Sequence, residues 1–120
     1  MPKLGPRTRV RLNDGVEMPL LGLGTWDTDR GIRGRKLIRQ GKGSLSAAEM
    51  HAHTKEEQHM IDAIKYAVIE CGYRHLDSAI VYESEKVIGV ALQEIFAETA
   101  LKREDIFMTT KVRCTYTHNT

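Results

Sequence analysis

The sequence predicts an α/β fold, in which helices alternate with the strands of a parallel sheet. Two observations support this class. Apolar residues recur at helical spacing in two segments after residue 54, and each segment is followed by an apolar run of strand length. Strands that alternate with helices in this way form parallel sheets with right-handed crossovers. The 120 residues are enough for about one domain.

A β-hairpin is expected first. Residues 10–12 and 16–18 alternate in polarity around residues 13–15, which are Asn, Asp and Gly. These residue types tolerate the positive φ of a tight turn, which favours a hairpin here. Residues 20–25 then form a continuous apolar run, and a strand without alternation suggests burial on both faces.

A helix and a strand are predicted next. Thr54 and Glu57 have the spacing of a capping box, and Gly72 can end the helix in a left-handed conformation. Residues 74–80 form the second predicted strand. The apolar positions of the helix are Met60, Ile61, Ile64, Ala67, Val68 and Cys71.

A second helix and a third strand complete the pattern. Ser84 can cap this helix, residues 102–105 form a polar turn, and residues 106–112 form the strand. The apolar face of the helix comprises Val87, Ile88, Ala91, Leu92, Ile95 and Phe96. The predicted order is therefore hairpin, then strand, helix, strand, helix, strand.

Residues 28–53 differ from this patterned sequence. Between residues 30 and 42 the chain is rich in arginine and lysine, contains no acid, and is interrupted by glycines. Such a segment buries too little apolar surface to offset the entropy of ordering it. We therefore expect a long disordered insertion within a single domain spanning residues 1–120.

Composition narrows the functional class. Hydrophobic residues make up 41% and charged residues 28%, which is typical of a soluble globular protein. The uncharged residues 18–26 are far fewer than the roughly 20 that a membrane span requires. Cys71 and Cys114 are too few for a disulfide framework, which favours the cytoplasm. The basic run lacks interleaved aromatic residues, so we expect neither a nucleic-acid nor a membrane partner.

Three motifs carry weak signals. Gly22 and Gly24 begin a dinucleotide-binding G-x-G-x-x-G pattern, but Asp27 stands where its third glycine would be. Tyr82 and Lys86 match the Y-x-x-x-K of short-chain dehydrogenases, although Tyr82 precedes the helix. A possible metal cluster, for which solvated surface residues are the favoured interpretation, comprises His51, His53, His59, Glu49, Glu56 and Glu57. We predict no metal site.

A stronger signal is distributed along the chain. Asp77 lies in the second strand of the predicted sheet, Tyr82 follows that strand, and Lys111 lies near the end of the third. In parallel α/β barrels, catalytic groups collect at the carboxyl ends of the strands. An acid, a phenol and an ammonium group at that edge suggest one catalytic cluster. A purely structural Asp–Lys pair is the alternative.

Several blocks in the same order resemble the aldo-keto reductase family. They cover most of the chain outside residues 28–53, and they are residues 12–15, 18–26, 72–79, 81–82, Glu85 with Gly89, 101–107 and 110–112. The resemblance implies the N-terminal part of a (β/α)8 TIM barrel, with the hairpin as a plug at its base. It also implies NADPH-dependent reduction of aldehydes or ketones by a monomeric enzyme.

The resemblance also implies residue roles. Tyr82 corresponds to the general acid that protonates the carbonyl oxygen, Lys111 to the cation beside it, and Asp77 to the carboxylate that holds the lysine. A phenol ordinarily ionises near pH 10, and a nearby cation favours its ionised form. Thr25 and Trp26 correspond to residues lining the nicotinamide and substrate pocket, and Asp77 also borders the cofactor ribose.

This sequence departs from the family pattern in three places. Arg113 replaces a pocket tryptophan, the segment after Trp26 is longer than usual, and the sequence stops after the third strand, before the position of the family's catalytic histidine. Three strands cannot close a barrel. We therefore expect an incomplete barrel that is inactive alone. The alternative is a catalytically dead remnant or splice form with at most a binding role.

Overall fold

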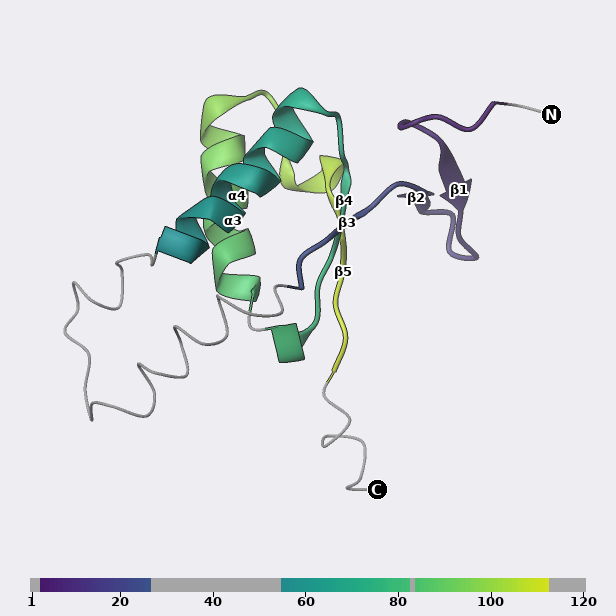
Figure 1. Ribbon diagram of the computed structural model, residues 1–120. Helices are drawn as coiled ribbons and strands as arrows, with labels where there is room; N and C mark the ends of the chain where they lie inside the picture. Colours follow the sequence, from purple (N-terminus) through teal and green to yellow (C-terminus); the bar gives the residue numbers. More distant parts are fainter. Residues whose placement is uncertain (1–2, 27–54, 83, 113–120) are drawn as a thin grey trace, which may run out of the picture.

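The computed structural model describes residues 3–26, 55–82 and 84–112. The capping residue Thr54 and the predicted insertion at 28–53 lie outside these ranges. Within them, a two-stranded hairpin precedes a three-stranded parallel sheet with two helices, as the sequence predicts (Figure 1). No helix in the described ranges is long and apolar enough to cross a membrane.

The hairpin consists of β1 (Arg9–Arg11) and β2 (Glu17–Pro19), which pair in antiparallel register. Its turn closes with a hydrogen bond from the Gly15 N–H to the Leu12 carbonyl, at 3.0 Å. Gly15 has a φ of 86°, which is the left-handed conformation that the turn requires and that glycine adopts without strain. The hairpin prediction is therefore confirmed.

The parallel sheet has the order β3–β4–β5 and runs through β3 (Leu23–Gly24), β4 (His75–Asp77) and β5 (Phe107–Thr109). The regular ladder is shorter than the predicted strands at 20–25, 74–80 and 106–112. The chain continues in the same direction beyond it, because Ser78 and Ile80 donate backbone hydrogen bonds to the carbonyls of Thr109 and Lys111.

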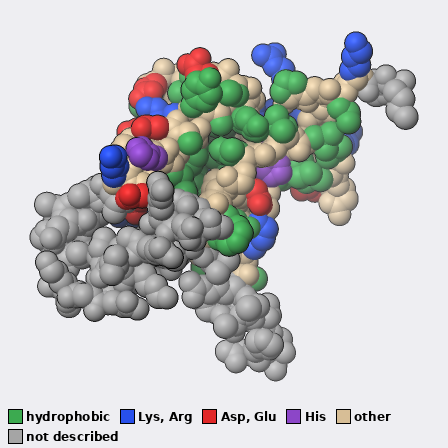
Figure 2. Space-filling view, in the orientation of Figure 1, with side chains coloured by type: hydrophobic (Ala, Val, Ile, Leu, Met, Phe, Trp, Pro, Cys, Tyr) green, Lys and Arg blue, Asp and Glu red, His purple; other side chains and the backbone are tan. Residues whose placement is uncertain are grey.

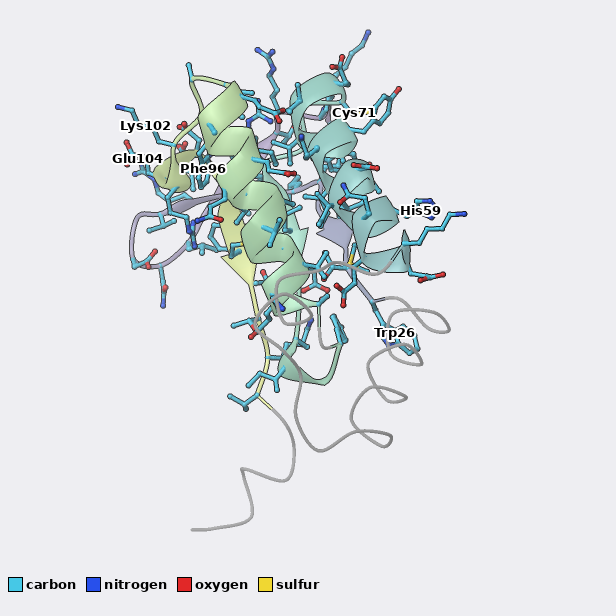
Figure 3. The ribbon with its side chains drawn as sticks, turned by 90° about the vertical axis from the view of Figure 1, so that its left-hand side faces the viewer. Trp26, His59, Cys71, Phe96, Lys102 and Glu104 are labelled. Atoms are coloured by element: carbon cyan, nitrogen blue, oxygen red, sulfur yellow. The ribbon has the colours of Figure 1, made fainter. Side chains whose placement is uncertain are left out.

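Two helical segments cover one face of this sheet. The first begins as α3 (Lys55–Lys65), continues as the π-helical η1 (Tyr66–Glu70), and stops at Gly72, whose φ is 80°. The second is α4 (Glu85–Glu98), and the two lie side by side (Figures 1 and 3). The Lys65 ammonium joins them through the Glu98 carboxylate at 2.7 Å.

The core lies between the helices and the sheet. Its buried members are Ile61, Ile64, Val68, Leu76, Val87, Ile88, Ala91, Leu92, Ile95 and Ile106. Leu23, Leu76 and Met108 are neighbours across the three strands and all belong to this side. Because side chains alternate along a strand, the neighbouring positions His75, Asp77 and Thr109 belong to the opposite face.

Two predictions about individual residues are wrong. Leu20 and Leu21 are 46% and 39% exposed, not buried on both faces, because they connect the hairpin to the sheet before β3 gains its partner strand. Ser84 is the residue before α4, but its side chain makes no capping hydrogen bond. Its hydroxyl instead contacts the Thr25 hydroxyl at 3.1 Å, so it connects the helix to the end of β3.

Candidate active site

The candidate site lies at the carboxyl ends of the parallel strands. Asp77 is the last residue of β4, and the short 3-10 helix η2 (Ile80–Tyr82) follows it and carries Tyr82. Lys111 comes two residues after β5. The backbone bond from the Ile80 N–H to the Lys111 carbonyl, at 3.1 Å, keeps the two extended segments side by side beyond the ladder.

The Lys111 ammonium is the centre of this site. Its Nζ donates to Asp77 Oδ1 at 2.8 Å, to the Ser78 carbonyl oxygen at 3.0 Å and to Tyr82 Oη at 3.2 Å. A lysine ammonium has three N–H groups, so these three acceptors account for all of them. The ammonium also lies 4.9 Å from the centroid of the Tyr82 ring. The three predicted catalytic residues therefore meet at Lys111, which contacts both Asp77 and Tyr82.

The surroundings favour the charged form of Lys111. Its pKa is raised above the ordinary lysine value, first by the hydrogen bond to the Asp77 carboxylate and then by the bond to Tyr82, while partial desolvation opposes both. The Lys111 and Asp77 side chains are 47% and 39% exposed, so the cluster remains open to solvent and to a ligand. The lysine is thus a permanent cation beside the phenol at neutral pH.

Thr25 supports the site from beneath. Thr25 is only 3% exposed, and its hydroxyl donates to the Asp77 carbonyl at 2.8 Å. Because a hydroxyl has a single hydrogen, the Ser84 hydroxyl must be the donor in its contact with Thr25. These two bonds join the ends of β3 and β4 to the start of α4, immediately behind Asp77.

Trp26 provides an exposed aromatic surface at the same end. It is 61% exposed, and its ring centroid lies 6.3 Å from that of Tyr82 with the planes inclined by 33°. Figure 3 shows Trp26 projecting at the end of the molecule opposite Cys71. An exposed aromatic ring beside a phenol can pack against a planar ligand.

Two of the weaker sequence motifs can be compared with the structure. A Cβ on Gly22 would lie 3.3 Å from His75 Cγ, so the glycine allows close approach of the histidine ring. The ammonium that contacts the Tyr82 hydroxyl is that of Lys111, whereas Lys86 of the Y-x-x-x-K motif lies in α4.

Only part of the possible metal cluster, for which solvated surface residues are the favoured interpretation, lies in the described chain. His59, Glu56 and Glu57 lie on α3, while Glu49, His51 and His53 lie outside the described residues. Within the described ranges no group of three or more histidine, cysteine or acidic side chains has the arrangement of a metal site.

Sequence reasoning missed several contacts around the site. The Ser78 carbonyl, a backbone group, is the third acceptor for Lys111. The Thr110 hydroxyl donates to Glu85 Oε1 at 2.8 Å, which connects the segment before Lys111 to the first residue of α4. The only sequence signal for these contacts is the presence of small polar residues at the strand ends. That signal is weak, because a residue type does not specify its hydrogen-bond partner.

Comparison with known proteins supports the same interpretation. The family model described as Aldo/keto reductase family matches residues 38–120. Aldo-keto reductase family 1 member C4 from Macaca fascicularis is 36% identical over 108 residues, which are 90% of this chain and 26% of the relative. Aldose reductase B from Dictyostelium discoideum is 37% identical over 108 residues, with 89% and 26% covered. The chain thus spans about a quarter of the length of these relatives.

Solved structures show the same likeness. The aldo-keto reductase of Bombyx mori in complex with NADP superposes with a TM-score of 0.61 at 31% identity, covering 92% of this chain and 29% of that one. The aldose reductase of Schistosoma japonicum gives 0.57 at 35% identity, with 86% and 25% covered. The sheet and helices described above are therefore part of an α/β barrel that is incomplete in this chain. The chain belongs to the aldo/keto reductase family.

Proposed function

We propose that this chain supplies the proton-donating part of an NADPH-dependent reductase that converts aldehydes or ketones to alcohols. The observation that carries this proposal is the Lys111 ammonium, whose N–H groups are directed at Asp77, at the Ser78 carbonyl and at Tyr82. A plain structural ion pair between Asp77 and Lys111 would not require a phenol as a further acceptor.

The direction of the contact between Lys111 and Tyr82 defines the chemistry. Because Nζ donates to Oη, it occupies a lone pair of the phenol and leaves the phenolic hydrogen free for another acceptor. A substrate carbonyl oxygen can be that acceptor. As the proton leaves, negative charge grows on Oη, and the adjacent ammonium stabilises it. Asp77 holds the ammonium in place, so its role is positioning.

The exposed groups around Tyr82 fit a nicotinamide cofactor. Trp26 offers an aromatic face, and the half-exposed Asp77 carboxylate can accept a hydrogen bond from a ribose hydroxyl. Thr25 lies beneath them and fixes the strand ends through its internal hydrogen bonds. When bound, the cofactor supplies the hydride for the carbonyl carbon.

The test restores the remaining strands by joining a relative's C-terminal portion after Val112. Tyr82→Phe should lower kcat/KM for a simple aldehyde by roughly 10²–10⁴-fold, the usual contribution of a positioned general acid. Lys111→Met should cost a comparable factor. The double variant should be little worse than either single one, because groups that act together do not contribute additively.

Two outcomes would contradict the proposal. Full activity in Tyr82→Phe, or strictly additive losses in the double variant, would leave Asp77 and Lys111 as a structural pair. Lys86→Met is the matched control, since it removes a lysine from the competing Y-x-x-x-K motif. Loss of activity in Lys86→Met and not in Lys111→Met would support the short-chain dehydrogenase mechanism instead.

The cofactor part of the proposal has a separate measurement. Trp26 is the single tryptophan of the 120 residues, so the part of the fluorescence signal that is lost in Trp26→Phe reports on this site. We expect saturable quenching by NADPH in the restored barrel, retained in Tyr82→Phe. We also expect the 120 residues alone to show no carbonyl reduction. The whole reductase should be a cytoplasmic monomer that acts on small carbonyl compounds.

A further inference from the structure

A cleft with several arginines lies between the start of the hairpin and the turn that leads into β4. Its volume is about 350 Å³. The residues that line it are Pro6, Arg7, Arg9, Pro19, Gly72 and Arg74. Three of these six residues are arginines, and this lining contains no acidic residue. The cleft is therefore strongly positive, although the chain as a whole carries a formal charge of only +2.

The three guanidinium groups are not equivalent. Arg74 is half-buried, and its Nη1 donates to the carbonyl oxygens of Val68 and Tyr73, both at 2.7 Å. These bonds fix one edge of its planar fork at the turn. Arg7 and Arg9 are exposed, and neither guanidinium makes a hydrogen bond or ion pair with another described residue. The cleft therefore combines the fixed guanidinium group of Arg74 with two guanidinium groups whose N–H donors are available to a ligand.

The acidic residues nearest to the cleft in sequence do not line it. Glu17 of β2 is the register partner of Arg11, at the turn-side end of the hairpin ladder. Glu70 of η1 lines a different surface hollow, which it shares with Tyr66 and Ile69. Neither carboxylate belongs to the lining of the cleft, so the charge of its three arginines calls for an anion from outside.

We propose that this cleft binds a phosphate group. Guanidinium forks match phosphate oxygens in a bidentate geometry, and a phosphate carries close to two negative charges at neutral pH. A single carboxylate offers one negative charge and two oxygens, whereas a phosphate offers more charge and more acceptor oxygens to three guanidinium groups. The volume of the cleft also leaves room for a small organic group attached to the phosphate.

This site is separate from the carbonyl-reducing site. Arg74 lies before β4 and Asp77 is the last residue of that strand, so the two sites are at opposite ends of the sheet. Figure 3 shows the same separation, with Trp26 at one end and Cys71, next to the lining residue Gly72, near the other. Basic side chains also project at the hairpin end of the molecule in Figure 2.

The experiment titrates the 120-residue chain with inorganic phosphate and with phenyl phosphate, at about 0.15 M salt, to limit general attraction. Calorimetry gives the dissociation constant, and arginine Nε–H NMR signals identify the side chains involved. Arg9→Gln should weaken binding on the order of three- to tenfold, since one charge-assisted contact is lost. Arg11→Gln removes the same charge from the same strand outside the lining, and it should change the constant less than about twofold.

The outcomes are distinguishable. Tighter binding of phenyl phosphate supports a phosphorylated small molecule as the ligand, and equal binding supports free phosphate. Equal weakening in Arg9→Gln and Arg11→Gln, or no saturable binding, would overturn the site. Loss of binding in Lys111→Met with none in Arg9→Gln would place the anion beside Tyr82 and also overturn it. Arg9 is exposed, so the variants should fold, which far-UV circular dichroism checks.

Discussion

The two faces of the parallel sheet are built from different chemistry. On the helix side, Leu76 is fully buried among aliphatic side chains. On the opposite side its neighbour His75 is half-buried and makes polar bonds at both ring nitrogens, to the Pro19 carbonyl at 2.9 Å and to the Thr109 hydroxyl at 2.8 Å. One face therefore supplies most of the stability, while the other fixes the relative positions of segments that carry functional groups.

The bonds of His75 show how the face opposite the helices, here called the open face, fixes these positions. The Pro19 carbonyl can only accept, so Nδ1 must carry a hydrogen. In the neutral ring Nε2 then accepts from the Thr109 hydroxyl. The ring also packs edge-on against Phe107, with centroids 4.9 Å apart. A single side chain thus connects the hairpin to β4 and β5.

The largest effect should come from the buried face. Leu76→Ala removes aliphatic groups from a fully buried position, and the cavity should lower the free energy of unfolding by about 2–5 kcal/mol. Urea unfolding followed by far-UV circular dichroism measures the change. A transition midpoint equal to that of the wild type would show that the helix side does not carry the stability.

A smaller and more local effect is expected from the open face. His75→Asn retains a donor near Nδ1 and should keep the hairpin attached, whereas His75→Gln places its amide nearer the position of Nε2 and should release the hairpin. Each lost hydrogen bond should cost about 1 kcal/mol. Amide exchange in β1 and β2 is the measurement. Equal exchange rates in the two variants would contradict the assigned role of Pro19.

The smallest effect on stability concerns Lys111 and depends on pH. Its pKa is raised in the folded chain by Asp77 and Tyr82, so its contribution to stability is fully present below the unfolded value of about 10.4. That contribution is lost as the pH rises through the folded pKa. The stability difference between the wild type and Lys111→Met should therefore be present at pH 8 and close in alkaline solution.

Lys65 is the matched comparison for this measurement. Its pKa is also raised, first by the hydrogen bond to Glu98, but its ammonium lies on the helices and away from Tyr82. Lys65→Met should show the same pH dependence of stability but should leave the kcat/KM of the restored barrel unchanged. A loss of activity equal to that of Lys111→Met would refute a specific role for the ammonium beside Tyr82.

The sequence predicted the order of elements better than their contacts. Alternation around Gly15 and helical spacing before Gly72 are local patterns, and the structure confirms both turns with positive φ values. The placement of Asp77, Tyr82 and Lys111 at one edge followed from the rule for parallel strands, and the structure brings them together. Family resemblance added roles that no local pattern contains.

What the sequence did not predict depends on partners far along the chain. The exposure of Leu20 reflects its place before the sheet begins, which hydrophobicity alone does not reveal. Ser84 has the residue type of a helix cap, yet its hydroxyl bonds Thr25, which is 59 residues away. The π-helical end at residues 66–70 was not predicted either, because no residue in it signals a wider turn.

The register of β4 has a consequence for folding accuracy. Leu23, Leu76 and Met108 lie in one row across the strands, and Gly24, Asp77 and Thr109 lie in the next. A shift of one residue would bury the Asp77 carboxylate among aliphatic side chains and expose the Leu76 side chain to water. A misaligned strand therefore has two separate costs in free energy. The Asp77 carboxylate, which would serve the reaction, therefore also disfavours a misaligned strand pairing. A substitution that removes its charge should weaken both the choice of register and the reaction.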